Sequence, residues 1–194
     1  MKNIAVLIPC YNEELTILKV IKDFERELPE ATIYVYDNNS IDNSVDIVIN
    51  NGTKLRKETL QGKGNVVRSM FRDIESDIYI IVDADDTYPA NMVHKMLAEM
   101  EISGSDMVCG DRLSQGIYAD ENKRLFHDFG NGLVKWLINI LFNSSLNDIM
   151  TGYRVFNRRF VKNIPIMSPG FEVETEMTLH GLDKRYKISE IPIT

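Results

Sequence analysis

The chain has 194 residues, of which 44% are hydrophobic, and this is enough to bury one good core, so a single domain is expected. It carries 22 lysines and arginines against 29 aspartates and glutamates, a net charge of -7, and no dense basic block, which disfavours nucleic-acid binding. Cys10 and Cys109 lie far apart beside apolar runs, which indicates buried free thiols in a reducing compartment rather than a disulfide framework.

The N-terminus enters a strand-like run directly after Met1-Lys2-Asn3, with no small-residue cleavage site, so we expect no signal peptide. Short β-rich runs lie at residues 4–8, 33–37, 54–58, 78–83 and 107–110, and segments of helical period separate them. This alternation predicts an α/β fold, with a mostly parallel sheet flanked by helices. Helix starts are signalled by Asn12, by Asp42 or Asn43, and by Pro89-Ala90, each soon after a strand.

The alternation stops after residue 111. A polar loop at 112–122 leads to an apolar helix at 133–142, which Lys135 interrupts and which is too short to cross a bilayer. Its wide apolar surface is more typical of plain core than of a membrane-contacting face. A segment at 147–156, a helix at 171–182 and a strand at 187–193 complete the chain.

The run Ile80-Ile81-Val82-Asp83-Ala84-Asp85-Asp86 places three carboxylates at the end of a strand that is apolar enough for a buried sheet. Charge of one sign packed this tightly needs a cation. Oxygen ligands of this kind suit Mg²⁺ or Mn²⁺, which usually share their remaining coordination positions with water and substrate phosphates. The alternative is an acidic turn in which Asp86 caps the next helix.

Two further strand ends carry polar residues, and in open α/β sheets ligands bind beyond such carboxyl ends. The first strand is followed by Pro9-Cys10-Tyr11-Asn12-Glu13-Glu14, which lacks the glycine fingerprint of NAD or FAD proteins. The second ends in Asp37-Asn38-Asn39-Ser40, which supplies acceptors for ribose hydroxyls or a base N–H. Asp42 or Asn43 nearby can equally be a helix N-cap.

A glycine-flanked lysine, in Gln61-Gly62-Lys63-Gly64-Asn65, opens a predicted helix at 65–75. The backbone N–H groups of such a helix start, together with the lysine charge, can meet a phosphate. The spacing is not that of a Walker A loop, and an ordinary loop lysine is the alternative interpretation.

Taken together and in this order, these motifs resemble the nucleotide-sugar half of inverting family 2 glycosyltransferases, which have a GT-A (Rossmann-like) fold. The resemblance implies a nucleotide-sugar half at 1–111 and an acceptor half at 112–194. It implies a divalent metal, Mg²⁺ or Mn²⁺, on Asp83 and Asp85, with Asp86 as a substitute. It assigns the donor to Pro9, Tyr11, Asn12, Glu13, Asp37, Asn39, Lys63, Asp83 and Ala84.

The second half looks like the branch of dolichyl-phosphate mannosyltransferases and polyprenyl-phosphate glycosyltransferases. The resemblance rests on Gly110-Asp111-Arg112, on the block from Asn147 to Arg154, on Gly170-Phe171-Glu172-Val173-Glu174, and on Glu190-Ile191-Pro192-Ile193. It implies that Arg112 and Arg154 bind the phosphate of a lipid acceptor, a task suited to their planar forks. Relatives often carry a further basic residue before the apolar helix, where this chain has His127-Asp128-Phe129, so Arg124 is the substitute candidate.

The implied reaction moves a sugar from a UDP- or GDP-sugar to a polyprenyl or dolichyl monophosphate. Because the acceptor phosphate is already largely ionised, the enzyme has to align two anions and neutralise the departing diphosphate. Asp148 is predicted as a base or positioning carboxylate, and a structural salt bridge with Arg154 is the alternative. Glu174 and Glu176 either orient the same region or simply begin a helix.

Two other functions stay open. A transferase of the same fold could act on a saccharide or protein hydroxyl, with Asp148 as an obligatory base, and a non-catalytic module could only bind the nucleotide sugar. Relatives of the branch continue beyond Pro192-Ile193-Thr194 with an interface or membrane segment. We therefore expect either a catalytic domain cut short or a member that needs a membrane partner, acting peripherally at the cytoplasmic face of a membrane, with homo-oligomerisation as a further possibility.

Overall fold

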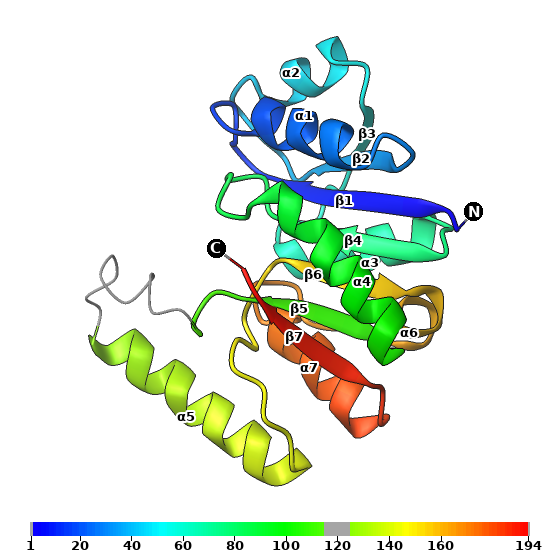
Figure 1. Cartoon of the computed structure of the whole chain (residues 1–194). Coiled ribbons are helices and arrows are strands. Elements are labelled where there is room, and N and C mark those ends of the chain that lie inside the picture. The colour runs from blue at the N-terminus through cyan, green and yellow to red at the C-terminus, as the bar shows by residue number, and fades with distance from the viewer. Residues whose placement is uncertain (1, 115–124, 194) are drawn as a thin grey trace.

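A seven-stranded sheet runs through the whole molecule in the computed structural model, which describes residues 2–114 and 125–193 (Figure 1). The strand order is β3-β2-β1-β4-β6-β5-β7. Every neighbouring pair is parallel except those of β6, which runs antiparallel to β4 and β5. The predicted α/β class with a mostly parallel sheet is confirmed. The strands are β1 (Ile4–Cys10), β2 (Thr32–Asp37), β3 (Lys54–Lys57), β4 (Ile78–Ile81), β5 (Met107–Asp111), β6 (Arg154–Asn157) and β7 (Ile188–Pro192).

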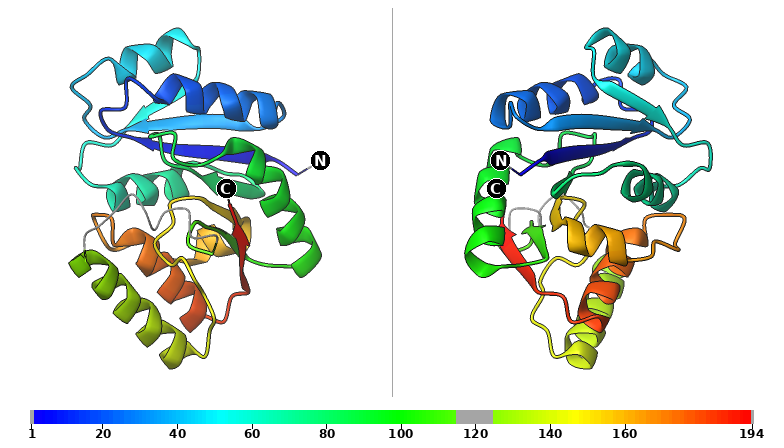
Figure 2. Two further views of the ribbon diagram at one scale, coloured as in Figure 1. Left: turned by 60° about the vertical axis from the view of Figure 1, so that its left-hand side comes forward. Right: turned by 90° about the vertical axis from the view of Figure 1, so that its right-hand side faces the viewer.

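Two layers of helices cover the sheet, one on each face (Figure 2). Helices α1, α2 and α4 pack on the face that presents Val6 and Ile80, while α3, α6 and α7 pack on the face that presents Leu7 and Ile81. Because neighbouring residues of a strand point to opposite faces, the unbroken apolar runs of β1 and β4 are what a sheet covered on both sides requires. The helices are α1 (Ile17–Glu27), α2 (Ser44–Asn50), α3 (Lys63–Asp73), the 3₁₀ helix η1 (Ala90–Met92), α4 (Val93–Ser103), α5 (Leu125–Phe142), α6 (Arg158–Asn163) and α7 (Val173–Asp183).

Helix α5 lies outside these layers, beyond α7 (Figure 1). Ile138 of α5 is buried in a small cluster with Leu146 and Ile149. Leu179 and Leu182 of α7 pack against this cluster. The other side of its C-terminal half is exposed: Trp136 is 57% exposed and Leu141 is 73% exposed. The expectation of plain core therefore holds for only one side of this helix. Among the described residues, no helix is long and apolar enough to span a membrane.

Three local features differ from the sequence-based expectations. Asn12 does not start a helix, since it adopts a left-handed conformation with φ 56° and α1 begins at Ile17. Strand β6 and helix α6 were not predicted, because four residues headed by an arginine show neither the length nor the alternation of a typical strand. Asn157 then caps α6, its side-chain oxygen accepting a hydrogen bond from the Phe160 amide at 2.8 Å.

Candidate active site

A cleft of about 460 Å³ opens beyond the carboxyl ends of β1 and β4. It lies where the strand order reverses around β1 and β4, the place at which ligands of open α/β sheets bind. The turns after β1, β2 and β4, the start of α3 and the segment before α7 all contribute side chains. The lining residues are Pro9, Cys10, Tyr11, Glu13, Asn38, Gln61, Gly62, Lys63, Val66, Asp83, Ala84, Asp85 and Phe171.

Most residues predicted for the donor and the metal come together in this cleft. Of the predicted set, Pro9, Tyr11, Glu13, Lys63, Asp83, Ala84 and Asp85 line it. Tyr11 from the β1 turn is half exposed, and Phe171, 78% exposed, contributes a second aromatic ring to the same cleft. The sequence did not predict a role for Phe171, because an isolated aromatic residue does not indicate what its ring will face.

The remaining donor candidates, Asn12, Asp37 and Asn39, make contacts within the turns beside the cleft. The Asn12 side-chain oxygen accepts from the Ile41 amide at 2.8 Å and so joins the turns that follow β1 and β2. Asp37 is buried and accepts from the Ser40 amide at 3.1 Å. Asn39 donates to the carbonyl of Thr59 at 3.0 Å. Their donor roles stay predictions.

Asn38 belongs to the motif that follows β2 but was assigned no role from the sequence, and it organises the other wall of the cleft. Its side-chain amide donates to the carbonyls of Glu58 and Leu60, both at 2.9 Å, and its oxygen accepts from the Gly62 amide at 2.7 Å. A single buried side chain thus shapes the loop that leads into α3. This role depends on partners 20 to 24 residues away, so the local sequence could not reveal it.

Glu13, Asp83 and Asp85 line the same cleft, and together they form its acidic wall. Burial raises the pKa of Glu13, and the negative charges of Asp85, Asp42 and Asp83 add to this effect. Apart from the ammonium of Lys63, the buried atom Oδ1 of Asp83 has no hydrogen-bond partner among the described residues. No cluster of three or more metal-binding side chains occurs in the described parts of the chain. One or two carboxylates beside a diphosphate are nevertheless the usual protein contribution to a Mg²⁺ site, so Asp83 and Asp85 fit such a cation.

Asp86 turns away from this wall. It adopts a left-handed conformation with φ 61°, and its carboxylate pairs with Lys19 of α1 at 2.6 Å. It therefore neither caps the following helix in this arrangement nor lines the cleft.

Lys63 brings a positively charged side chain to the cleft. Its ammonium lies 2.5 Å from Oδ1 of Asp83 and 2.6 Å from Oε1 of Glu174. Burial by itself would lower the pKa of Lys63, but the two carboxylates outweigh it, so the pKa is raised and the lysine is charged.

Two backbone amides at the α3 start, those of Gly64 and Asn65, are already engaged by protein carbonyls and are not free to meet a phosphate. The amide of Gly64 donates to the carbonyls of Pro169 at 2.9 Å and Gly170 at 3.1 Å, and that of Asn65 also donates to Pro169 at 3.3 Å. A Cβ atom at Gly64 would collide with the backbone of Ser168, so the glycine allows this close approach. The segment before α7 therefore covers the Gly64 and Asn65 amides, while the Lys63 side chain faces the cleft.

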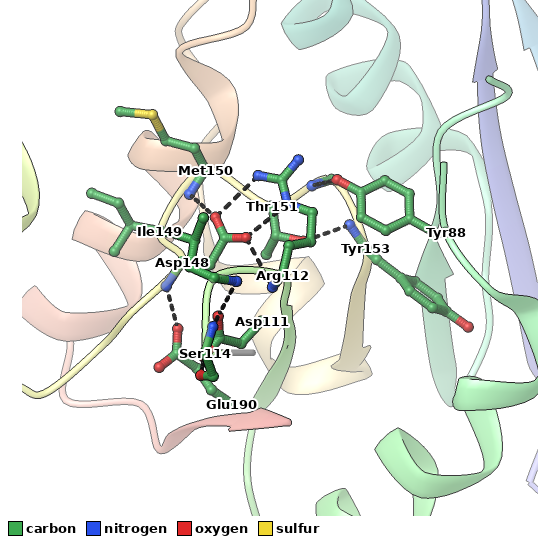
Figure 3. A network of polar contacts seen from close by, with 12 residues as sticks. Tyr88, Asp111, Arg112, Ser114, Asp148, Ile149, Met150, Thr151, Tyr153 and Glu190 are labelled. Carbon is green, nitrogen blue, oxygen red and sulfur yellow. Dashed lines mark hydrogen bonds and ion pairs between the residues drawn. The ribbon is translucent and has the colours of Figure 1, made fainter. Parts of the chain in front are cut away.

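Arg112 and Asp148 form a second charged group next to the cleft (Figure 3). Nε and Nη2 of Arg112 donate to the two carboxylate oxygens at 2.7 and 3.1 Å, and this leaves Nη1 outside the pair. Burial opposes the charge on Arg112, but the hydrogen bond to Asp148, with Asp83 nearby, raises its pKa. Asp148 therefore forms a salt bridge, as the structural alternative predicted. Its partner is Arg112, however, and the predicted pairing with Arg154 is wrong.

Glu190 supports this group from β7. Its two carboxylate oxygens accept from the amides of Asn147 at 2.7 Å and Asp148 at 2.9 Å (Figure 3). The carboxylate thereby orients the loop that presents Asp148 to Arg112. The sequence did not predict this role of Glu190, because it depends on the pairing of β7 with β5.

Arg154 is fully buried, which argues against contact with an acceptor in this arrangement. Its guanidinium donates to the carbonyls of Thr151 at 2.9 Å and Ile149 at 2.7 Å and to the hydroxyl of Thr178 at 2.9 Å. It ties β6 and the preceding loop to α7. Arg124, the other predicted phosphate ligand, lies outside the described residues.

Gly152, in the loop before β6, lies against the acidic wall. A Cβ atom at this position would overlap the carboxylate of Asp83, so the loop passes directly over it. The Gly152 amide donates to the Tyr88 hydroxyl at 2.8 Å, and the Tyr88 ring lies 5.7 Å from the Arg112 guanidinium. Tyr88 thus connects the two charged groups, a link that the sequence did not suggest.

The family model described as glycosyl transferase family 2 matches residues 5–164. The chain belongs to glycosyltransferase family 2. The predicted family is therefore confirmed, and the motifs that led to it come from both halves of the chain.

Three relatives show what this chain is similar to in sequence. Protein RfbJ of Shigella flexneri is 48% identical over 114 residues, which cover 59% of this chain and 88% of RfbJ. Glycosyltransferase AglJ of Haloferax volcanii is 30% identical and covers 98% of this chain, which spans only 62% of AglJ. The dolichyl-phosphate hexose transferase of the same organism is 28% identical, over 98% of this chain and 82% of its own length. The similarity to the dolichyl-phosphate hexose transferase confirms the resemblance to the dolichyl-phosphate branch.

Among solved structures, a crystal structure of glucosyl-3-phosphoglycerate synthase from Mycobacterium tuberculosis with Mn²⁺, UDP-glucose and phosphoglyceric acid is similar, with a TM-score of 0.78. The two chains are 19% identical, and the match covers 98% of this chain and 69% of that one. This similarity confirms the predicted GT-A fold for a family 2 member.

Proposed function

We propose that this family 2 member transfers a hexosyl group, with inversion, from a nucleoside-diphosphate sugar to a polyprenyl or dolichyl monophosphate, with the help of a divalent cation. One observation carries the proposal: Asp83, Asp85 and Lys63 face a single cleft of about 460 Å³ at the edge of the sheet. Carboxylates that can hold a metal and an ammonium that can meet a phosphate are the charges that a sugar diphosphate needs.

The donor side is supported by the shape and chemistry of the cleft. Its volume is of the size that encloses a small organic ligand, about 300–1,000 Å³. Tyr11 and Phe171 offer aromatic faces to a base or sugar ring, and the similar synthase was crystallised with UDP-glucose and Mn²⁺. The identity of the base and of the sugar depends on details of this lining.

The cation would supply charge neutralisation to the leaving diphosphate. Side chains of the protein would hold the cation and align the two phosphate-bearing reactants. Asp83 and Asp85 would hold the cation, Lys63 would contact the departing phosphate, and Arg112 would draw the acceptor phosphate towards the opposite face of the sugar.

The acceptor is proposed from two observations. Arg112 lies beside the cleft with Nη1 outside its pair with Asp148, and one of the relatives is named a dolichyl-phosphate hexose transferase. A phosphate monoester, with a second pKa of about 6, needs no general base at neutral pH. This agrees with the environment of Asp148, which is only 2% exposed and is held by Arg112.

A hydroxyl acceptor has one observation in its favour, because protein groups already engage the forks of both Arg112 and Arg154. The two acceptors respond differently to Arg112→Ala, which should abolish transfer to a lipid phosphate and spare transfer to a hydroxyl. Arg154→Ala is not a clean test, because it would empty a fully buried position.

We further propose peripheral action at the cytoplasmic face of a membrane, where a polyprenyl phosphate resides. The exposed side chains Trp136, Leu137, Ile140 and Leu141 of α5 support this placement. Flotation with vesicles that contain polyprenyl phosphate measures it. Trp136→Ser/Leu141→Ser should reduce binding, and undiminished binding would contradict a contribution of α5.

The proposed function is tested first by donor binding. Thermal unfolding with UDP-glucose, UDP-N-acetylglucosamine or GDP-mannose, each with and without Mn²⁺, should show one donor that raises the midpoint in a metal-dependent way. Radiolabelled transfer from that donor to polyprenyl phosphate in vesicles then tests the acceptor. Binding without any turnover would favour the non-catalytic module, and transfer only to a saccharide or protein hydroxyl would favour the other transferase.

A further inference from the structure

Lys63 occupies the position in which a metal ion would be expected to neutralise Asp83. The ammonium lies 2.5 Å from the buried atom Oδ1 of Asp83, which has no other hydrogen-bond partner among the described residues. On its other side the ammonium lies 2.6 Å from Glu174. The side chains of Lys63, Asp83 and Glu174 are 10%, 24% and 9% exposed, so water screens these charges only partly.

The two carboxylates are fixed more firmly than the lysine between them. Glu174 lies in the first turn of α7, and Asp83 packs against Gly152, which has no room for a Cβ atom. The backbone of Lys63 is also held, because the Gly64 amide donates to the carbonyls of Pro169 and Gly170. The flexible four-carbon stem of Lys63 is therefore the part that can move.

We propose that Lys63 and a divalent cation compete for Asp83, and that Glu174 is the positioning residue that retains Lys63 when Asp83 binds the metal. This inference rests on the proposed function, because it concerns the same metal and donor site. It adds a role for Glu174 and an order of events, neither of which follows from the presence of an acidic motif.

The physical reason is the cost of leaving a buried charge alone. When a cation takes Asp83, Lys63 loses one of its two partners and is repelled by the new charge. Glu174 then remains as its counter-ion, so the lysine does not become an unpaired buried ammonium. A nucleoside diphosphate offers Lys63 phosphate oxygens as a third partner, which frees Asp83 further, so nucleotide and metal should bind cooperatively.

A purely structural triad makes a different prediction. If the three residues only hold α3 to α7, removal of Lys63 should loosen the site and weaken metal binding, or leave it unchanged. Competition predicts the opposite sign. The affinity for Mn²⁺ alone, measured without donor or acceptor, therefore separates the two explanations.

The experiment is a Mn²⁺ titration followed by electron paramagnetic resonance of the free ion, without nucleotide and then with UDP or GDP. It compares the wild-type chain with Lys63→Gln, Glu174→Gln and the double variant. Lys19→Gln is the matched control for the lost positive charge, because Lys19 pairs with Asp86 next to the acidic wall but is 60% exposed. Glu172→Gln is the matched control for the lost negative charge, because Glu172 is exposed and two residues from Glu174.

Lys63→Gln should bind Mn²⁺ about tenfold more tightly than the wild type, and Glu174→Gln about tenfold more weakly. The double variant should bind like Lys63→Gln, because Glu174 acts only through the lysine. The two controls should each change the affinity by less than about twofold, since exposed charges are screened. If Lys63→Gln does not fold, Lys63→Met takes its place, because it also removes the charge and keeps most of the aliphatic side chain.

Unchanged or weaker Mn²⁺ binding by a folded Lys63→Gln variant would overturn the inference, as would unchanged binding by Glu174→Gln. Both results leave the proposed function intact if the wild type still binds Mn²⁺ together with UDP or GDP. A wild-type chain that binds neither nucleotide with Mn²⁺ would instead remove the proposed function and this inference with it.

Discussion

Charged side chains of the site find their partners across long stretches of chain. Lys63 pairs with Glu174 111 residues away, and Arg112 pairs with Asp148 36 residues away. Each pair is partly withdrawn from water, so losing one member leaves the other with an uncompensated charge. Single substitutions at these positions should therefore have effects that depend on the partner.

Asp83→Asn should lower kcat/KM by about 10²-fold or more, because the neutral amide cannot hold a divalent cation on the leaving diphosphate. Steady-state transfer with the donor identified by thermal shift measures this. Asp86→Asn is the matched control. Its carboxylate pairs with Lys19 outside the cleft, so its activity should stay within about threefold of the wild type. Undiminished, metal-independent turnover by Asp83→Asn would contradict the proposed site.

Arg112→Ala should destabilise the fold by about 2–3 kcal/mol, because it leaves the buried Asp148 without its counter-ion. Adding Asp148→Asn should recover part of this loss, so the double variant is more stable than the sum of the single effects. Urea unfolding of the four proteins completes the cycle. Strict additivity would show that the pair does not couple in solution.

At the scale of elements, the active-site cleft depends on how α3 meets the segment before α7. Gly62 and Gly64 allow the α3 start to touch the backbone of Pro169 and Ser168, and the Gly64 amide is satisfied there. This contact brings Lys63 of α3 and Glu174 of α7 together. The glycines of the motif therefore serve helix packing, and the lysine between them serves the cleft.

Gly64→Ala should cost about 2 kcal/mol or more of stability, because its methyl group collides with fixed backbone. The affinity for the donor should fall as well, since the displaced helix carries Lys63 with it. Gly132→Ala in α5 is the control. No described atom lies within 4 Å of the position that its Cβ atom would take, so the substitution should leave the stability unchanged or raise it by about 0.5–1 kcal/mol. Thermal unfolding and donor titration measure both variants, and equal behaviour of the two would refute the packing argument.

At the scale of the whole molecule, the sheet is continuous from β3 to β7 and combines strands from both halves of the chain. The chain has a net charge of -7, and some of its carboxylates are paired locally, among them Asp73 with Arg72 and Glu75 with Lys162. Several of these carboxylates have lowered pKa values. Arg72 lowers the pKa of Asp73, and the hydroxyl of Ser69 lowers that of Glu58.

Acid should therefore destabilise the fold. A carboxylate whose pKa is lowered on folding binds fewer protons in the native state, so its contribution is complete above its unfolded pKa and is lost as the pH falls through the folded one. For Glu58 this loss begins near its ordinary value of 4.5. Glu190, whose pKa burial raises, acts in the opposite direction.

The measurement is the urea midpoint between pH 6 and pH 3. Glu58→Gln should cost about 1 kcal/mol at neutral pH, where it removes a charge-assisted hydrogen bond, and should show a shallower loss of stability in acid. If the variant and the wild type lose stability with the same slope, Glu58 does not contribute to acid unfolding.

The sequence was sufficient for the features that depend on neighbouring residues. Apolar runs predicted β1 and β4, and the polar residues that follow them predicted which strand ends would line the cleft. Pro89-Ala90 correctly marked the start of η1. Strand β6 escaped prediction because its four residues form a strand only through pairing with β4 and β5 on either side.

The sequence by itself determined the fold class, the family and the set of charged residues, because these follow from local periodicity and from motifs in a given order. Only the tertiary structure decided which charges meet. It placed Asp148 on Arg112, buried Arg154 among carbonyl groups, and set Lys63 between Asp83 and Glu174. The physical reason is that an ion pair depends on a few ångströms of separation and on exclusion from water, and both arise only when distant segments pack.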